Sequence, residues 1–330
     1  MADLNLTAFA ADSFDAATLT TSINAAPYAP GVIARRKLFR EVPMNTTEAQ
    51  VEIVSDEVRL IQSSPRGGPA PVHPRAARNM VSFQAPHLRT RDTLLADSWQ
   101  NRRGFSEATL ADVQRERDRV LASMRGSLET TLEYHRVRAL SGQVLDADGS
   151  VMVDLLAEFG VAQNTHDMNL DVTTTNVANQ IIAAKRKAES ALRAATPTAW
   201  VAFASAGFMD ALRAHSSVSA THEGWIAAAA LSADLRDGFS LTGVLFIEVR
   251  NPTGVTMIEA NAAYLVPEGV PDMFLTHFAP ADYADTVNNA GLPLYARAQE
   301  LPFNRGWMLE SQSNPVSIVT RPRAVVKLTA

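Results

Sequence analysis

The chain has 330 residues, with 30 Lys and Arg against 35 Asp and Glu, which gives a formal net charge of −5. Its 46% hydrophobic and 20% charged residues exclude a wholly disordered chain, and the absence of cysteine excludes disulfides, thiolate metal sites and thiol nucleophiles. The acidic balance disfavours a dedicated binder of duplex nucleic acid, because phosphate neutralisation supplies most of that affinity.

The sequence shows no secretory leader at its start and no run of about 18 apolar residues, so we expect a protein made in the cytoplasm without a membrane span. Residues 1–45 read as an arm, because they contain Pro27, Pro30 and Gly31 and lack a long periodic pattern. We predict that this arm carries a short helix and docks on another surface. The basic run at residues 35–37 is either solvated or faces an acidic partner surface.

The next region predicts a long β-hairpin. Residues 51–62 are rich in Val and Ile, residues 79–85 resume an extended pattern, and Pro65, Gly67 and Gly68 between them favour a tip. An arm of about 12 residues would reach about 40 Å. Because a two-stranded hairpin is marginally stable by itself in water, we expect it to lie on another surface, such as a neighbouring subunit.

A long helix is predicted over residues 106–140. Ser106 is a good N-cap residue, and Glu107 suits the positive end of the helix dipole. Apolar residues then recur at helical spacing as far as Leu140. A helix of this length would span about 50 Å, which is longer than a typical helix of a globular protein.

Strands and helices then follow in an irregular order, which predicts an α+β fold. A tight hairpin is expected to turn at Asp148-Gly149. The elements predicted after residue 140 are strands at 143–145 and 150–154, a helix at 177–194, a strand at 200–203, a helix at 208–215, a strand at 242–249 and an extended segment at 315–328.

The search for chemistry finds no catalytic, cofactor or metal site. Asp146, Asp148 and Gly149 resemble the opening of a calcium loop, but the twelfth position is Ala157 where that loop needs Glu, so a plain turn is favoured. The seven histidines form no HExxH pair, and there is no P-loop, no GxGxxG motif and no nucleophile elbow.

The cations of the predicted hairpin are all arginines. Arginine suits bidentate pairing with carboxylates across an interface, so Arg66, Arg75 and Arg78 are candidate subunit contacts, with Gly67 and Gly68 at the tip. Two alternatives stay open: the arginines are ordinary solvated loop residues, or a coding bias favours arginine over lysine throughout the chain.

Several stretches together resemble the lambda-like major capsid protein E family of tailed bacteriophages. The matches keep the family's order from about residue 30 to the C-terminus. They are APHL at 85–88, DT at 92–93, RGF at 103–105, TLEY at 131–134, ALSG at 139–142, LDADG at 145–149, FG at 159–160, FAPADY at 278–283, NNAGLPLY at 288–295, SNP at 313–315 and RP at 321–322.

The resemblance implies a Hong Kong 97-like capsid fold. The sequence would divide into five parts: an N-terminal arm at 1–45, an extended loop at 46–90, a peripheral domain at 91–160 with its spine helix at 106–140, a mainly axial domain at 161–300, and C-terminal strands at 301–330 that return to the peripheral domain.

The resemblance also implies a function in self-assembly. Copies of the chain would form hexameric and pentameric capsomers of an icosahedral shell, which encloses double-stranded DNA without sequence-specific binding. The virion would be its final location, after assembly in the host cytoplasm. Expected partners are a portal and a decoration or cement protein. A separate scaffolding protein is also expected, because the extended loop begins by about residue 46 and leaves no long N-terminal scaffolding segment.

Some members of the fold cross-link subunits through a lysine in the extended loop. Residues 46–90 contain no lysine, so we predict that this chain forms no such bond. The main alternative is an encapsulin-like shell protein of a bacterial nanocompartment. An enzyme or a monomeric binding module is disfavoured.

Overall fold

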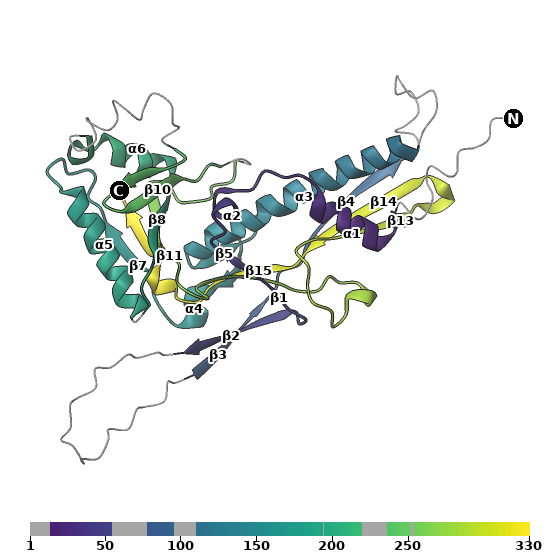
Figure 1. Cartoon of the computed structure of the whole chain (residues 1–330), viewed down its shortest axis with the longest axis horizontal. Coiled ribbons are helices and arrows are strands. Elements are labelled where there is room, and N and C mark those ends of the chain that lie inside the picture. The colour runs from purple at the N-terminus through teal and green to yellow at the C-terminus, as the bar shows by residue number, and fades with distance from the viewer. Residues whose placement is uncertain (1–13, 55–77, 96–109, 194, 220–235, 252–253) are drawn as a thin grey trace, which may run out of the picture. The chain divides into compact units, whose positions relative to one another are not determined.

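The computed structural model describes residues 14–54, 78–95, 110–193, 195–219, 236–251 and 254–330 (Figure 1). The chain forms two compact units, each built from separate stretches of sequence. Unit 1 comprises Met1–Ala49, Phe83–Tyr134 and Thr276–Ser317, and unit 2 comprises Gln50–Ser82, His135–Leu275 and Ile318–Ala330.

Six α-helices and three short 3-10 helices lie wholly within the described residues. They are α1 (Ala16–Ala25), α2 (Val32–Arg36), α3 (Leu110–Leu140), α4 (Leu155–Phe159), α5 (Val177–Leu192), α6 (Ala206–Ala214), η4 (Ala284–Thr286), η5 (Pro302–Asn304) and η6 (Pro322–Ala324).

Unit 1 contains a three-stranded antiparallel sheet in the order β13–β14–β4, covered by α1 and α3. Its strands are β13 (Tyr295–Glu300), β14 (Gly306–Ser313) and β4 (Leu88–Leu95). Leu19 and Ile23 of α1 and Leu121 of α3 are almost completely buried between these layers. The N-terminal arm thus forms part of the hydrophobic core of its own unit.

Unit 2 contains a six-stranded mixed sheet in the order β7–β16–β11–β8–β10–β9. Alternate strand residues such as Ala202, Phe246 and Leu265 pack with α5 and α6 in one core, so both helices cover the same face of the sheet. The strands are β7 (Asn164–Asp167), β16 (Val326–Thr329), β11 (Ala262–Glu268), β8 (Ala199–Ala204), β10 (Val244–Glu248) and β9 (Phe239–Leu241).

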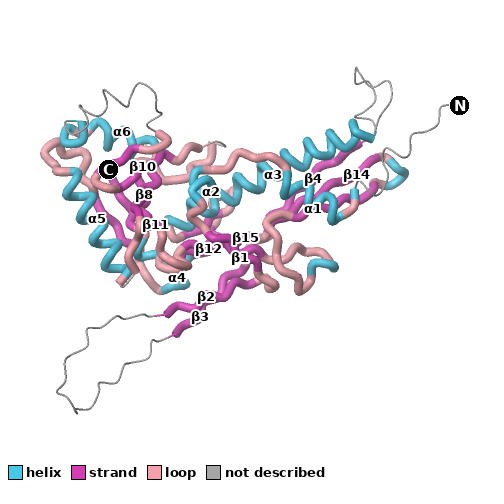
Figure 2. The backbone as a smooth tube through the Cα atoms, in the orientation of Figure 1, coloured by secondary structure: helices cyan, strands magenta, loops and turns pink. Residues whose placement is uncertain are grey.

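Three smaller sheets complete the described secondary structure (Figure 2). They are the three-stranded sheet β1–β12–β15, the ladder β2–β3 and the hairpin β5–β6. Their strands are β1 (Arg40–Pro43), β12 (Phe274–Phe278), β15 (Pro315–Val319), β2 (Glu48–Val54), β3 (Arg78–Gln84), β5 (Gln143–Leu145) and β6 (Val151–Asp154).

The structure confirms the expected α+β class and the type of most predicted elements. The long helix is described from Leu110, so its predicted first turn at 106–109 lies outside the described residues. The turn at Asp148-Gly149 is confirmed, because the Asp148 carboxylate accepts hydrogen bonds from the backbone N–H and the hydroxyl of Ser150. This is the geometry of a plain turn.

One predicted strand boundary differs from the structure. The strand expected at 242–249 begins at Val244, because Thr242 and Gly243 both have positive φ angles and form the tight turn between β9 and β10. The C-terminal strands separate: β14 pairs with β13 and β4, whereas β16 pairs with β11 and β7 in the six-stranded sheet. Residues 301–330 thus contribute strands to different sheets, and their assignment to the peripheral domain stays a prediction.

Candidate assembly interface

The arm is attached to α3 by a buried arginine. The guanidinium of Arg125, only 9% exposed as a residue, donates to the backbone carbonyls of Ile23 at 3.0 Å, Asn24 at 2.5 Å and Ala26 at 2.5 Å. These carbonyls close the C-terminal end of α1, where a helix carries unpaired acceptors and partial negative charge. The same guanidinium lies 4.3 Å from the centroid of the Tyr28 ring, so one side chain binds both α1 and the segment after it.

Two turns further along α3, a buried carboxylate holds the second helix of the arm. Glu133 Oε1 accepts the backbone N–H of Ile33 at 2.7 Å, and Oε2 accepts that of Ala34 at 3.1 Å. The negative charge thus caps the positive end of α2. Gly31 is required beside this carboxylate, because a Cβ atom there would lie 2.2 Å from the Glu133 side chain.

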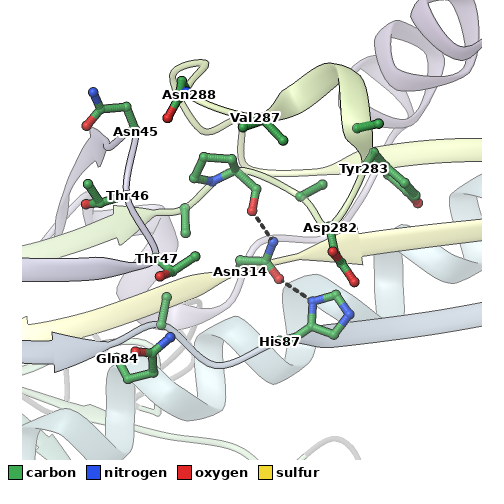
Figure 3. Close-up of a pocket in the computed structure, with 15 residues that line it drawn as sticks. Asn45, Thr46, Thr47, Gln84, His87, Asp282, Tyr283, Val287, Asn288 and Asn314 are labelled. Carbon is green, nitrogen blue, oxygen red and sulfur yellow. Dashed lines mark hydrogen bonds between the residues drawn. The ribbon is translucent and has the colours of Figure 1, made fainter.

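A second junction in unit 1 joins three stretches that are far apart in the sequence. His87 Nδ1 donates to Asn314 Oδ1 at 2.8 Å, and Asn314 Nδ2 donates to the carbonyl of Pro280 at 2.7 Å (Figure 3). The carbonyl of Asn314 also accepts the N–H of Ala279 at 2.9 Å. Since Asn314 is 5% exposed, these bonds satisfy a buried amide that would otherwise be costly.

The polar junction forms one wall of an open cavity of about 700 Å³, lined entirely by residues of unit 1. Thr46 and Thr47 lie on one side of it in Figure 3, and Asp282 and Tyr283 on the other. Gly291 allows a close approach of two backbones near this cavity, because its N–H donates to Met44 and a Cβ atom would lie 2.1 Å from the carbonyl of Phe278. The stretches at 85–88, 278–283, 288–295 and 313–315 therefore meet at one place.

Strands β2 and β3 form a two-stranded ladder with one exposed face. Along β3, Val81 and Phe83 are buried while Met80 is 64% exposed. Along β2, Ala49 and Val51 are buried and the residues between and around them are exposed. Because side chains of a strand alternate between faces, the exposed residues share the outer face of the ladder.

The predicted contact residues fall at the end of this ladder or beyond it. Arg66, Gly67, Gly68 and Arg75 lie outside the described residues. Arg78 is the first residue of β3, and its side chain is not described. The structure thus neither brings these five residues together nor separates them.

The residues that attach the arm were not among the predicted contact residues. Arg125 and Glu133 are buried charges on α3, and their spacing of eight residues places both on the same face of the helix. Leu121, Leu128 and Leu132 are also buried on that side of the helix. Charged residues within an apolar helical stripe are the signal that could have identified them.

Unit 2 contains a separate, partly buried ionic network. The hydroxyl of Tyr264 donates to Glu259 Oε2 at 2.5 Å, Arg138 Nη1 lies 3.1 Å from Glu259 Oε1, and Lys327 Nζ lies 3.7 Å from Oε2. Burial alone would raise the pKa of Glu259, but the Tyr264 hydroxyl and the two cations lower it overall. Burial and the neighbouring carboxylate raise the pKa of Tyr264.

Within the described residues, no group of three or more His, Asp or Glu side chains could hold a metal ion. The same part of the chain contains no helix that is long and apolar enough to cross a membrane. The buried polar contacts of unit 1 described above instead attach the arm to α3 and join distant stretches of the chain at Asn314.

Comparison with known proteins identifies the family. A family model described as phage major capsid protein E matches residues 15–330. The chain belongs to the phage major capsid protein E family. It is 24% identical to the major capsid protein of Pseudomonas phage KPP10, over 96% of this chain and 97% of that relative. It is 22% identical to the major capsid protein of Salmonella phage Felix O1, over 96% of both chains.

The fold agrees with that family. The chain matches a structure described as the capsid of Cyanophage P-SCSP1u with a TM-score of 0.52 and 11% identity, covering 92% of this chain and 89% of the other. The expected Hong Kong 97-like capsid fold is thus confirmed. The protein is a structural component of the virion, a phage major capsid protein E that self-assembles into the icosahedral head shell. The nanocompartment alternative is not favoured.

Proposed function

We propose that the β2–β3 ladder and the loop at its end make the contacts between subunits that hold hexameric and pentameric capsomers together. The observation that carries this proposal is the exposed outer face of the ladder, with Met80 64% exposed. An isolated two-stranded sheet is marginally stable in water. In a shell made of one chain, the surface available to cover that face belongs to a neighbouring copy.

The predicted contact residues fit this proposal. Arg66, Arg75 and Arg78 would pair with carboxylates of the neighbouring copy, and Gly67 and Gly68 would form the tip. Residues 1–45, 46–90 and 91–160 would serve as arm, extended loop and peripheral domain, and the axial domain would come mainly from residues 161–300. Arg125 and Glu133 attach the arm to α3. Because the arm directly precedes the extended loop in the chain, this attachment would hold the start of the loop in place.

The assembled shell would enclose double-stranded DNA without reading its sequence. The net charge of −5 supports this, because a chain with an acidic balance does not hold phosphates through a general basic surplus. We further propose that assembly takes place in the host cytoplasm with a separate scaffolding protein and a portal, and that a decoration or cement protein binds the shell. The chain itself would have no enzymatic role.

Shortening the loop tests the proposal directly. Residues 55–77 are replaced by Asn-Gly, which closes a two-residue hairpin turn between β2 and β3. We expect a folded subunit with the melting temperature of the wild type and no closed shells in electron micrographs. Asp148→Ala in the β5–β6 turn is the matched control, because it alters an exposed turn elsewhere and should leave shells intact. Normal shells from the shortened chain would contradict the proposal.

A further inference from the structure

The hairpin between β13 and β14 presents an aromatic ring to solvent. Phe303 is 89% exposed, the largest value among the exposed large hydrophobic side chains of the described residues. Its backbone has φ 64° and ψ 26°. This left-handed conformation is uncommon for residues other than glycine, asparagine and aspartate, and unusual for a bulky side chain. Both features are unfavourable for an isolated subunit.

The hairpin tip is built to be rigid on both sides of the ring. Pro302 fixes its own φ angle, and the N–H of Leu301 donates to the carbonyl of Gly306 at 2.9 Å, which closes the loop. Gly306 has φ 134°, and a Cβ atom there would lie 2.0 Å from the carbonyl of Leu94. The guanidinium of Arg305 lies 5.5 Å from the Phe303 ring centroid. The ring is thus held outward by the backbone.

The hairpin is connected to the core of unit 1 by a pair of stacked aromatic rings. The rings of Trp307 and Phe14 stack at 4.4 Å between centroids and 2° between planes, and both belong to the core of unit 1. Leu95, which pairs with Gly306 across the sheet, is 45% exposed. Leu95 and Phe303 are thus exposed apolar side chains at this end of the sheet, which is connected to the core of unit 1 through Trp307.

We propose that Phe303 is the anchor of a contact with a second copy of this chain. A rigid aromatic side chain loses little entropy on binding, and aromatic residues dominate the affinity of protein interfaces. The unfavourable backbone conformation is retained because it aims the ring at that partner. The occupant is a second copy because the chain builds a shell from copies of itself. The inference is independent of the proposed role of the β2–β3 ladder, and it rests on shell assembly.

Phe303→Gly separates an interface role from a structural role. Glycine relieves the left-handed backbone and removes the ring, so the free subunit should melt at the same temperature as the wild type or higher. Self-assembly should weaken, with the chain concentration for half assembly raised at least about tenfold. The assay uses the full chain expressed with the head-assembly proteins of its own phage, followed by sedimentation velocity. Val287→Gly, at another side chain that is 64% exposed, is the control and should assemble normally.

A photo-crosslinking phenylalanine analogue at position 303 identifies the partner. Irradiated particles should contain covalent dimers of this chain, with the crosslink mapped to a second copy by mass spectrometry. Crosslinks to a scaffolding or decoration protein instead, or normal assembly of Phe303→Gly, would overturn the inference. Failure of the wild-type chain to assemble under these conditions would instead contradict shell assembly itself, so the two failures can be told apart.

Discussion

At the scale of single residues, a few buried polar side chains in unit 1 connect segments that are distant in the sequence. Asn314 joins residue 87 to residue 280, and Glu133 on α3 holds the start of α2. The Asn314 and Glu133 side chains are almost fully buried, so the hydrogen bonds that they make satisfy polar atoms with little access to water. Loss of one partner leaves another polar group without a bond, which costs more than the bond contributes.

Asn314→Ala should lower the free energy of unfolding by about 1–3 kcal/mol, because His87 and the carbonyl of Pro280 each lose a buried partner. Chemical denaturation of the subunit measures the change. Asn45→Ala is the control, since Asn45 is exposed on the same cavity and should be nearly neutral. Equal effects of the two substitutions would show that the junction does not stabilise the fold.

The buried His135 predicts a pH dependence of stability. It is 1% exposed, and burial lowers its pKa to about 4, partly opposed by Asp146. The unfolded chain takes up this proton near pH 6.5, whereas the folded chain stays neutral until about pH 4. The contribution of neutral His135 to the free energy of unfolding is therefore complete above pH 6.5. It is lost as the pH falls toward 4, and the total loss is about 3 kcal/mol.

Unfolding free energies of the wild type and His135→Leu at pH 7, 5.5 and 4.5 check this prediction. The variant should lose stability less steeply over that range, whatever its stability at pH 7. Parallel pH profiles would contradict the assigned role of His135.

At the scale of elements, α3 organises unit 1 by binding both helices of the arm. Arg125 meets the negative end of α1, and Glu133 meets the positive end of α2. The two charges lie eight residues apart on a helix of about 46 Å, so they fix the direction of the arm along it. The arm is therefore held in place by its own chain, through α3, over the length of α1 and α2.

Arg125→Met keeps the apolar stem and removes the guanidinium, so the C-terminal end of α1 loses its donors. We expect the free energy of unfolding to fall by about 1.5–3 kcal/mol. Trypsin should also cut faster after Arg35 and Lys37, which are exposed in the arm. Arg119→Met on the same helix is the control, because Arg119 pairs with Glu116 at the surface. Unchanged proteolysis in the Arg125 variant would contradict the proposed attachment.

Sequence periodicity predicted the elements whose burial is regular. The apolar spacing of α3 and of α5, and the Asp148-Gly149 turn, were visible because local spacing decides them. The roles of Arg125 and Asn314 could not be predicted from the sequence, because each side chain binds carbonyls that only tertiary packing brings near. The turn at Thr242 was missed for a similar reason: threonine rarely adopts the positive φ angle that this hairpin imposes.

At the scale of the whole molecule, the chain is a member of the phage major capsid protein E family, and its lysines bear on how copies are held together in the shell. Its four lysines are Lys37, Lys185, Lys187 and Lys327, and none lies in the segment 46–90. The loop therefore cannot supply an amine for an isopeptide bond between subunits. We therefore expect noncovalent contacts or a cement protein to stabilise the shell.

Mature particles boiled in detergent should therefore release the chain as a single band at its monomer mass. Denaturing electrophoresis of purified heads measures this, with unboiled particles as the control for complete assembly. A ladder of covalent oligomers would contradict the prediction, and mass spectrometry would then locate the crosslinked residues.

Assembly through the extended loop is tested most directly by a cryo-electron microscopy reconstruction of the assembled head at a resolution that traces the backbone. We predict a closed icosahedral shell of hexamers and pentamers in which residues 55–77 of each subunit lie on a neighbouring copy. A reconstruction in which that segment folds back onto its own subunit, with the outer face of β2–β3 uncovered by any neighbour, would contradict it.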